Sequence, residues 1–283
     1  MPSVTGLFIY PVKSLRGYAV PAAELDALGF VGDRRFLVVD ASDKFLTQRA
    51  LPRMALIETK LAAGTLTLSA DGAGGISVPT ASDPARPAEA LAKAGVPLRT
   101  VSIWKSEGLQ AEDCGEPAAA WLSGFLGQTC RLVRIGEKFS RPVLKSAARP
   151  GDVFTFADGA PFLAISEASV AELNDRIQEN HGEPVPMNRF RPNIVVNGCA
   201  AFAEDAWTRF RIGDSVFLNA GRSERCIITT TDQFTGARGK EPLKTMATFR
   251  RDPANPTAVH FAINVIHETK RGTVRVGDAV NLL

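Results

Sequence analysis

The sequence has few cysteines: Cys114, Cys130, Cys199 and Cys226 are the four in 283 residues. No two of them have the C-x-x-C spacing of a zinc site or a redox motif. Four widely spaced cysteines in a chain of this length are not typical of a secreted disulfide scaffold. We therefore expect a protein of the reducing cytoplasm.

Long apolar runs are also missing from the sequence. No run approaches the ~18–20 apolar residues that a membrane-spanning helix needs. The first residues, Met-Pro-Ser-Val-Thr-Gly, lack the basic region and the apolar core of a secretory signal. These two absences argue against a membrane-spanning protein and against a secreted one.

The excess of one charge over the other is small, because the formal net charge is only +3. A dedicated nucleic-acid-binding protein carries a concentrated basic stripe, so we expect no nucleic-acid partner. A local basic pocket for one phosphate stays compatible with this charge. The fractions of hydrophobic residues (45%) and charged residues (22%) are those of an ordinary globular protein with one large domain or two ordinary ones.

Short runs of β-branched and aromatic residues predict strands along most of the chain. The predicted strands are 4–12, 35–40, 54–60, 65–69, 98–104, 131–135, 193–197, 211–218, 225–231, 258–266, 273–276 and 279–282. The glycine-rich segment 71–75 predicts a hairpin loop, since no helix pattern follows it as in a phosphate-binding loop. Because βαβ alternation is absent, we expect a mainly β fold with accessory helices, in the α+β class.

Helices are predicted at 116–126, at 166–180 and, as a short element, at 88–94. The second of these is the clearest. Ser166 is a good N-cap, and Val170, Leu173 and Ile177 follow at the spacing of one buried helix face.

A thiol lies between charged residues and a β-branched run. Cys226 follows Arg222 and Arg225 and precedes Ile-Ile-Thr-Thr-Thr, so the pattern places it near the start of the predicted strand 225–231. Nearby cations favour the thiolate, which acts as a nucleophile or as a metal ligand. The alternative is an inert core thiol, because free cysteine is among the most buried residue types.

Five further segments join this one to form a recognisable series. They are Tyr10-Pro-Val-Lys13-Ser14, Gly32-Asp33-Arg34-Arg35-Phe36, Pro161-Phe-Leu-Ala-Ile-Ser166-Glu-Ala-Ser169, Asn188-Arg-Phe-Arg191-Pro-Asn193 and Val276-Gly-Asp278. In this order they resemble the MOSC superfamily, and most of all the branch with the mitochondrial amidoxime-reducing component and its bacterial relatives. The resemblance implies an N-terminal MOSC-type β-barrel domain over residues 1–115 and a MOSC β-barrel domain over residues 116–283.

The resemblance also implies a binding site for the molybdenum cofactor. Cys226 matches the protein thiolate that holds molybdenum in this family. The residues that match positions binding the pterin and its phosphate are Lys13, Ser14, Arg34, Arg35, Arg191, Asn193 and Arg225. Arg, Lys, Ser and Asn side chains suit phosphate oxygens, although taken alone these charges are equally those of a solvated surface. We expect Lys13, Arg34, Arg191 and Arg225 to converge on one cleft.

The implied activity is reduction of N-hydroxylated small molecules such as amidoximes, hydroxylamines and N-oxides. Asp232 is a candidate proton donor or water-orienting group, with a turn or cap role as the alternative. This chain has Asp232-Gln-Phe where the relatives usually have Asp-Pro-Asp, and Gly159-Ala160 where they have hydroxyl residues. Both departures bear on which substrate is preferred.

Partners follow from the same resemblance. We expect a separate electron-donor protein, a flavin or iron–sulfur reductase, since no cysteine-clustered ferredoxin-like segment is present. The eukaryotic relatives carry a membrane anchor before Tyr10, and we expect none here because nine residues precede it. Two other functions are a sulfur carrier with a persulfide on Cys226, weakened by the lack of a pyridoxal-phosphate desulfurase domain, and a carrier of intact molybdenum cofactor.

Overall fold

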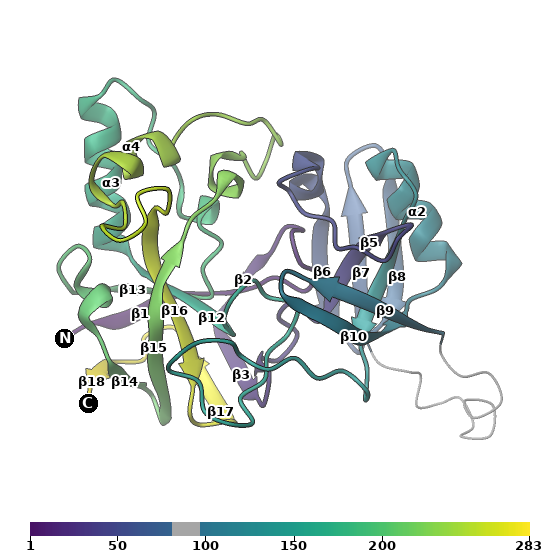
Figure 1. Cartoon of the computed structure of the whole chain (residues 1–283), viewed down its shortest axis with the longest axis horizontal. Coiled ribbons are helices and arrows are strands. Elements are labelled where there is room, and N and C mark those ends of the chain that lie inside the picture. Colours follow the sequence, from purple (N-terminus) through teal and green to yellow (C-terminus); the bar gives the residue numbers. More distant parts are fainter. Residues whose placement is uncertain (81–96) are drawn as a thin grey trace. The chain divides into compact units, whose positions relative to one another are not determined.

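The computed structural model in Figure 1 describes residues 1–80 and 97–283. The chain forms two compact units that interleave in sequence. The large unit comprises Met1–Ile9, Ala19–Val31 and Pro142–Leu283, and the small unit comprises Tyr10–Tyr18 and Gly32–Arg141. Strands dominate both units, which confirms the mainly β prediction. The small unit ends at Arg141, whereas we expected a domain boundary after residue 115.

An eight-stranded sheet forms the centre of the large unit, with the strand order β18-β14-β15-β16-β12-β13-β1-β2. Its strands are β1 (Ser3–Ile9), β2 (Tyr18–Val20), β12 (Phe162–Ser166), β13 (Ile194–Asn197), β14 (Arg209–Ile212), β15 (Ser215–Glu224), β16 (His260–His267) and β18 (Val280–Leu282). The strands β12 and β13 are parallel, whereas β16 is antiparallel to both β12 and β15. A three-stranded sheet of β17 (Gly272–Arg275), β3 (Ala22–Asp26) and β4 (Gly29–Phe30) completes the unit.

Two helices pack beside this sheet, α3 (Glu167–Glu179) and α4 (Leu243–Phe249). The predicted cap of α3 is confirmed, because the Ser166 hydroxyl accepts the Ser169 N–H at 3.0 Å. The predicted stripe is also buried, with Leu173 and Ile177 fully inside. Among the described residues, no helix is both long and apolar enough to cross a lipid bilayer.

The Val276-Gly-Asp278 motif is a turn that ties the two ends of the chain together. The Val4 N–H donates to the Asp278 carbonyl at 2.9 Å, and the Gly277 N–H donates to the Val4 carbonyl at 2.8 Å. Gly277 has a φ of +96°, which favours glycine. This motif therefore has a structural role.

The small unit contains two sheets and one helix. One sheet has the order β5-β11-β10-β9 and the other β6-β7-β8. The elements are β5 (Phe36–Asp40), β6 (Glu58–Ala62), β7 (Thr65–Ala70), β8 (Gly74–Pro79), β9 (Leu98–Ile103), β10 (Ser106–Asp113), α2 (Glu116–Leu126) and β11 (Cys130–Ile135). The helix has the predicted bounds, and its buried face packs with residues such as Met54 and Leu132 in one apolar core.

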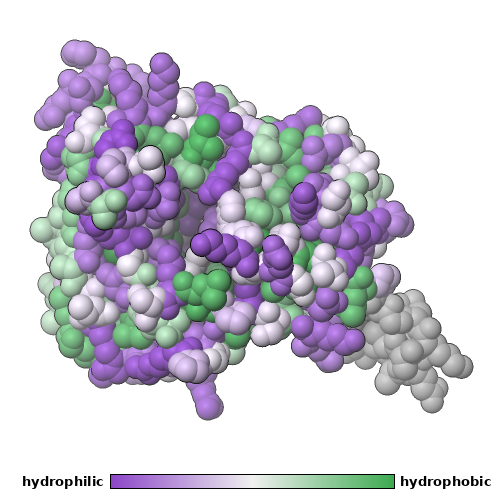
Figure 2. Space-filling view, in the orientation of Figure 1, coloured by the Kyte–Doolittle hydropathy of each residue, from purple (hydrophilic) through white to green (hydrophobic). Residues whose placement is uncertain are grey.

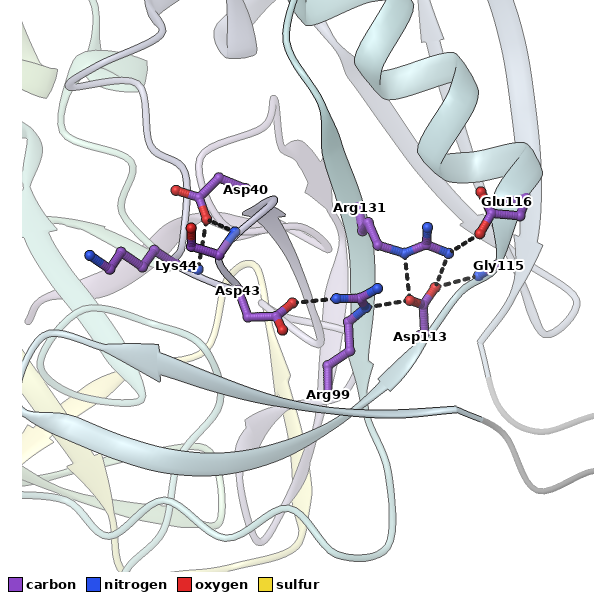
Figure 3. A network of polar contacts seen from close by, with 9 residues as sticks. Asp40, Asp43, Lys44, Arg99, Asp113, Gly115, Glu116 and Arg131 are labelled. Atoms are coloured by element: carbon purple, nitrogen blue, oxygen red, sulfur yellow. Dashed lines mark hydrogen bonds and ion pairs between the residues drawn. The ribbon is translucent and has the colours of Figure 1, made fainter.

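A network of ion pairs connects the strands of the first sheet (Figure 3). Asp113 accepts hydrogen bonds from Arg99 at 2.5 Å, from Arg131 at 2.6 Å and from the Gly115 N–H at 2.8 Å. Arg99 also pairs with Asp43, and Arg131 pairs with Glu116. Burial disfavours the charged form of Asp113, yet the hydrogen bonds from both arginines outweigh it and lower the pKa of this carboxyl. Arg99, Arg131, Asp43, Asp113 and Glu116 thus each have a partner of opposite charge.

Several predicted elements differ from the structure. The prediction of a strand at 225–231 is wrong, because Ile227–Thr230 form a 3₁₀ helix, η4. The Thr229 and Thr230 hydroxyls donate to the carbonyls three residues before them, at 3.0 and 2.8 Å, and so compete with strand pairing. The expected single strand 211–218 is the hairpin β14–β15, which turns at Gly213 with φ +54°. The short helix expected at 88–94 lies outside the described residues.

Candidate functional site

Cys226 lies two residues after the end of β15, at the N-cap of η4, and not at a strand start. Both the N–H and the hydroxyl of Thr229 donate to the Cys226 carbonyl, at 3.1 and 3.0 Å. On the other side, the Arg225 N–H donates to the carbonyl of Val259, the residue before β16, at 2.7 Å. The backbone is therefore held on both sides of a partly exposed thiol.

The other three cysteines are poor candidates for a thiolate. Burial raises the pKa of Cys114 to about 12. Burial also raises the pKa of Cys130, and burial together with the nearby Glu204 charge raises that of Cys199. These thiols keep their protons at neutral pH, so they are poorly suited to act as nucleophiles or metal ligands.

Two cationic side chains of the large unit bond to neutral groups near Cys226. Arg225 donates to the Phe190 carbonyl at 2.8 Å and to the Ser223 hydroxyl at 3.2 Å. Arg191 donates to the Gln233 amide oxygen at 3.3 Å. These neutral acceptors position the two guanidinium groups without themselves cancelling a charge.

The Asn193 side chain forms hydrogen bonds with the backbone of two strands. Its side-chain amide donates to the Phe8 carbonyl at 3.2 Å and accepts from the Leu163 N–H at 3.3 Å. It therefore connects β12 with β1 next to the start of β13, with a side chain that is 1% exposed. A phosphate contact by Asn193 stays a prediction.

Asp232 forms a turn, the alternative that its sequence position left open. Its carboxylate accepts the Phe234 and Thr235 N–H groups, both at 2.9 Å, and a hydrogen bond from Arg189 at 2.9 Å. Burial disfavours the charged form, but these donors outweigh it and hold the pKa of Asp232 below its ordinary value. A carboxylate stabilised in this way is a weak proton donor at neutral pH.

The remaining candidates lie together in the small unit. The Lys13 N–H donates to the Phe36 carbonyl at 2.9 Å and the Arg34 N–H donates to the Tyr10 carbonyl at 2.7 Å, so two predicted motifs run side by side. The Lys13 ammonium lies 5.8 Å from the Phe45 ring centre, and the Arg34 guanidinium lies 4.4 Å from that of Tyr10. Ser14 and Arg35 flank them in the same two segments.

The backbone is strained at three of these positions. The φ angles of Ser14, Arg34 and Arg191 are +66°, +47° and +55°, in the left-handed region that non-glycine residues rarely adopt. Such conformations cost free energy and gather at ligand-binding sites. Each unit thus brings its own candidate residues together, and the convergence of Lys13 and Arg34 with Arg191 and Arg225 stays a prediction.

Buried polar atoms near Arg191 test whether a polar ligand fits. Asn188 Oδ1, Arg189 Nε and Thr231 Oγ1 are buried without a hydrogen-bonding partner. Leaving such atoms unsatisfied is costly, and a ligand with donors and acceptors removes the cost. Together with the cations, they fit an anionic, hydrogen-bonding group such as a phosphate-bearing pterin.

Sequence reasoning missed the residues that position these side chains. Phe190 holds Arg225 through its carbonyl, Gln233 holds Arg191, and Arg189 holds Asp232. The signal was available, since Phe190 and Arg189 stand inside the Asn188-to-Asn193 motif and Gln233 follows Asp232.

The chain matches two family models, the MOSC N-terminal beta barrel domain over residues 1–129 and the MOSC domain over residues 151–281. It is 36% identical over 295 residues to mitochondrial amidoxime-reducing component 1 of Mus musculus, covering 99% of this chain and 82% of the relative. The Homo sapiens protein of that name is 36% identical over 298 residues, covering 99% and 83%. Molybdenum cofactor sulfurase of Danio rerio is 32% identical over 286 residues, covering 96% of this chain and 32% of the relative.

Proposed function

The chain belongs to the MOSC family, and we propose that it is a molybdenum-dependent reductase of N-hydroxylated compounds. One observation carries the proposal. Cys226 is a partly exposed thiol on a turn held on both sides, next to Arg225 and in a chain similar over its length to amidoxime-reducing components. The thiols that burial keeps protonated do not have this setting.

The reaction needs electrons and protons from outside the substrate. Reduction of an amidoxime to an amidine takes two electrons and two protons, breaks the N–O bond and releases water. When bound, the molybdenum cofactor supplies the redox-active metal for this chemistry, and a soft thiolate is a suitable ligand for it. A separate protein, such as a flavin or iron–sulfur reductase, supplies the electrons.

The side chains have separable roles in this proposal. Cys226 supplies the thiolate ligand. Lys13, Ser14, Arg34, Arg35, Arg191 and Arg225 hold the pterin and its phosphate through charge-assisted hydrogen bonds, with Asn193 supporting the fold beneath them. Asp232 orients the segment that follows Cys226, and it also positions the Arg189 side chain. In this proposal it does not donate a proton itself.

A sulfur carrier is the second candidate, because a molybdenum cofactor sulfurase is also similar to 96% of this chain. In that role Cys226 carries a persulfide and transfers its outer sulfur to an acceptor. The same thiol serves both candidates, so the bound species decides between them. A persulfide on purified protein that contains no molybdenum favours the carrier.

The test compares Cys226→Ala with the control Cys199→Ala, whose thiol burial keeps protonated. We expect Cys226→Ala to abolish benzamidoxime reduction with a chemical electron donor, while most of the pterin stays bound through the cations. Cys199→Ala should keep both activity and pterin content. Full reductase activity in Cys226→Ala excludes the thiolate-ligand role and, with it, the proposed function.

A further inference from the structure

One turn of the small unit, residues 12–15, carries the two candidate binding residues Lys13 and Ser14. The Leu15 N–H donates to the Val12 carbonyl at 3.2 Å and closes the turn. Ser14 is the third residue of the turn and has a φ of +66°. A type II turn requires a positive φ at this position, which is why glycine or asparagine usually occupies it. Serine is strained there, so contacts from outside the turn have to hold it.

The two ends of this turn are fixed in the apolar core of the small unit. Val12 and Leu15 are fully buried there, in one cluster with Phe36. The Lys13 N–H also donates to the Phe36 carbonyl at 2.9 Å. These contacts fix where the turn lies, whereas the direction of its middle peptide groups depends on polar contacts such as the one at the Ser14 carbonyl.

Gln48 makes that contact. Its side-chain amide donates to the Ser14 carbonyl at 2.8 Å, and the Gln48 residue is 0% exposed. The Gln48 backbone is itself held by a turn, because the Ala50 and Leu51 N–H groups donate to the Thr47 carbonyl at 3.1 and 3.0 Å. A buried carbonyl that loses its donor is costly, so removal of this amide favours a different conformation of the Ser14 turn.

The segment that carries Gln48 also contacts the Lys13 side chain. Phe45 stands three residues before Gln48, and its ring centre lies 5.8 Å from the Lys13 ammonium. The Phe45 ring meets Trp104 edge to face, with ring centres 4.8 Å apart, and is held in place by it. Residues 45–48 therefore support both the backbone and the cationic side chain of the turn.

We propose that Gln48 is a positioning residue for phosphate binding, because it keeps the turn in the left-handed conformation in which Lys13 and Ser14 bind the anion. This inference rests on the proposed function, in which these two residues hold the phosphate of the pterin. Gln48 acts through the turn and does not contact the ligand itself. It allows serine, with its hydroxyl, to occupy a position that otherwise favours glycine.

The test uses Gln48→Met, which keeps the length of the side chain and removes the donor. The probe is inorganic phosphate, added to the full chain without cofactor and followed through the backbone amide NMR signals of Lys13, Ser14 and Leu15. We expect phosphate to shift these signals in the wild type. The Kd from this titration should rise about tenfold in Gln48→Met, the effect of one charge-assisted contact.

The readout has to be specific for the turn. Hydrophilic side chains are spread over the small unit in Figure 2, and exposed lysines such as Lys60 and Lys105 also attract phosphate. Signals from the turn itself separate its phosphate binding from this general attraction.

Two further variants separate positioning from folding. Ser123→Ala removes another side-chain contact with the backbone of the small unit, since the Ser123 hydroxyl donates to the Cys130 carbonyl and accepts the Cys130 N–H. This control should keep the wild-type Kd for phosphate. In the Ser14→Gly background, glycine adopts a positive φ without strain, so Gln48→Met should weaken phosphate binding by no more than about threefold.

An unchanged Kd in Gln48→Met, or an equal loss of affinity in Ser123→Ala, overturns the inference. Phosphate that leaves the signals of the turn unshifted in the wild type overturns it as well. Pterin content separates this result from the proposed function. A wild type that binds phosphate at the turn, but contains no pterin when purified from cells that make the cofactor, contradicts the proposed function alone. Full pterin content together with an unchanged Kd in Gln48→Met contradicts the positioning role alone.

Discussion

Arginines do two different jobs in this molecule, and two pairs of them, one pair in each unit, show the contrast. In the small unit, Arg99 and Arg131 pair with Asp113, and their charges are cancelled by carboxylates. In the large unit, Arg191 and Arg225 bond to an amide oxygen, a hydroxyl and a carbonyl. The first two arginines therefore hold the fold through ion pairs, whereas neutral acceptors position the second two.

Backbone conformation follows the same division. The paired arginines lie on regular strands, in register with their neighbours. Arg191 has a φ of +55°, and Arg34 and Ser14 share this left-handed conformation. Left-handed conformations of this kind gather at ligand-binding sites, and Asp43 of the ion-pair network also has one, with a φ of +58°.

The largest effect is expected from Asp113→Asn in the small unit. Removal of this carboxylate leaves two arginines in a partly buried network, and we expect a loss of about 3 kcal/mol of unfolding free energy. Because the folded-state pKa is lowered, the stabilisation by Asp113 is present above its unfolded pKa and is lost as pH falls through the folded pKa. Urea denaturation at pH 7 and pH 3 measures the loss of unfolding free energy and its dependence on pH. A wild-type midpoint in the variant contradicts the structural role.

His267 offers a third case beside the two pairs of arginines. Like Arg191 and Arg225 it bonds to a neutral group, but its side chain is uncharged. Its Nε2–H donates to the Asp26 carbonyl at 2.7 Å, and burial lowers the pKa of the imidazole to about 4. The unfolded chain takes up this proton below about pH 6.5, so stability is full above that pH and falls as pH drops towards 4.

We expect a loss of about 2 kcal/mol of stability between pH 7 and pH 5 from this histidine. Denaturation of His267→Gln should show a flatter pH dependence across that range, whereas the exposed His181→Gln should follow the wild type. Equal slopes in all three proteins exclude His267 as the source.

A smaller effect is expected at the N-cap of α3, where the contact joins two neutral groups. Ser166→Ala removes the acceptor of the Ser169 N–H, and we expect a loss of about 1 kcal/mol. Chemical denaturation measures it, with pterin content as the second readout, which should not change. An unchanged midpoint shows that the cap contributes nothing.

Local patterns predicted part of this structure well. The bounds of α2 and the cap and buried stripe of α3 follow from helix spacing and from one serine, because both depend on neighbours in sequence. The strand at 225–231 failed for the same reason: β-branched residues favour strands, but threonine hydroxyls bond to carbonyls three residues back and give a 3₁₀ turn.

Interleaving of the units could not be predicted from local patterns. Strand β1 pairs with β13, nearly 190 residues later, and the β3 strand pairs with β17 near the other end of the chain. The site shows the same limit. The motifs named Arg191 and Arg225, but the partners Gln233 and Phe190 that position their guanidinium groups come from the tertiary fold.

The most direct test of this division is to remove one arginine of each kind and measure two quantities. Arg191→Gln and Arg131→Gln are compared for pterin content as purified and for unfolding free energy of the cofactor-free protein. We expect Arg191→Gln to lose most of its pterin with stability within about 0.5 kcal/mol of wild type, and Arg131→Gln to keep its pterin and lose about 2 kcal/mol. Full pterin content in Arg191→Gln, or the same pair of changes in both variants, contradicts the account.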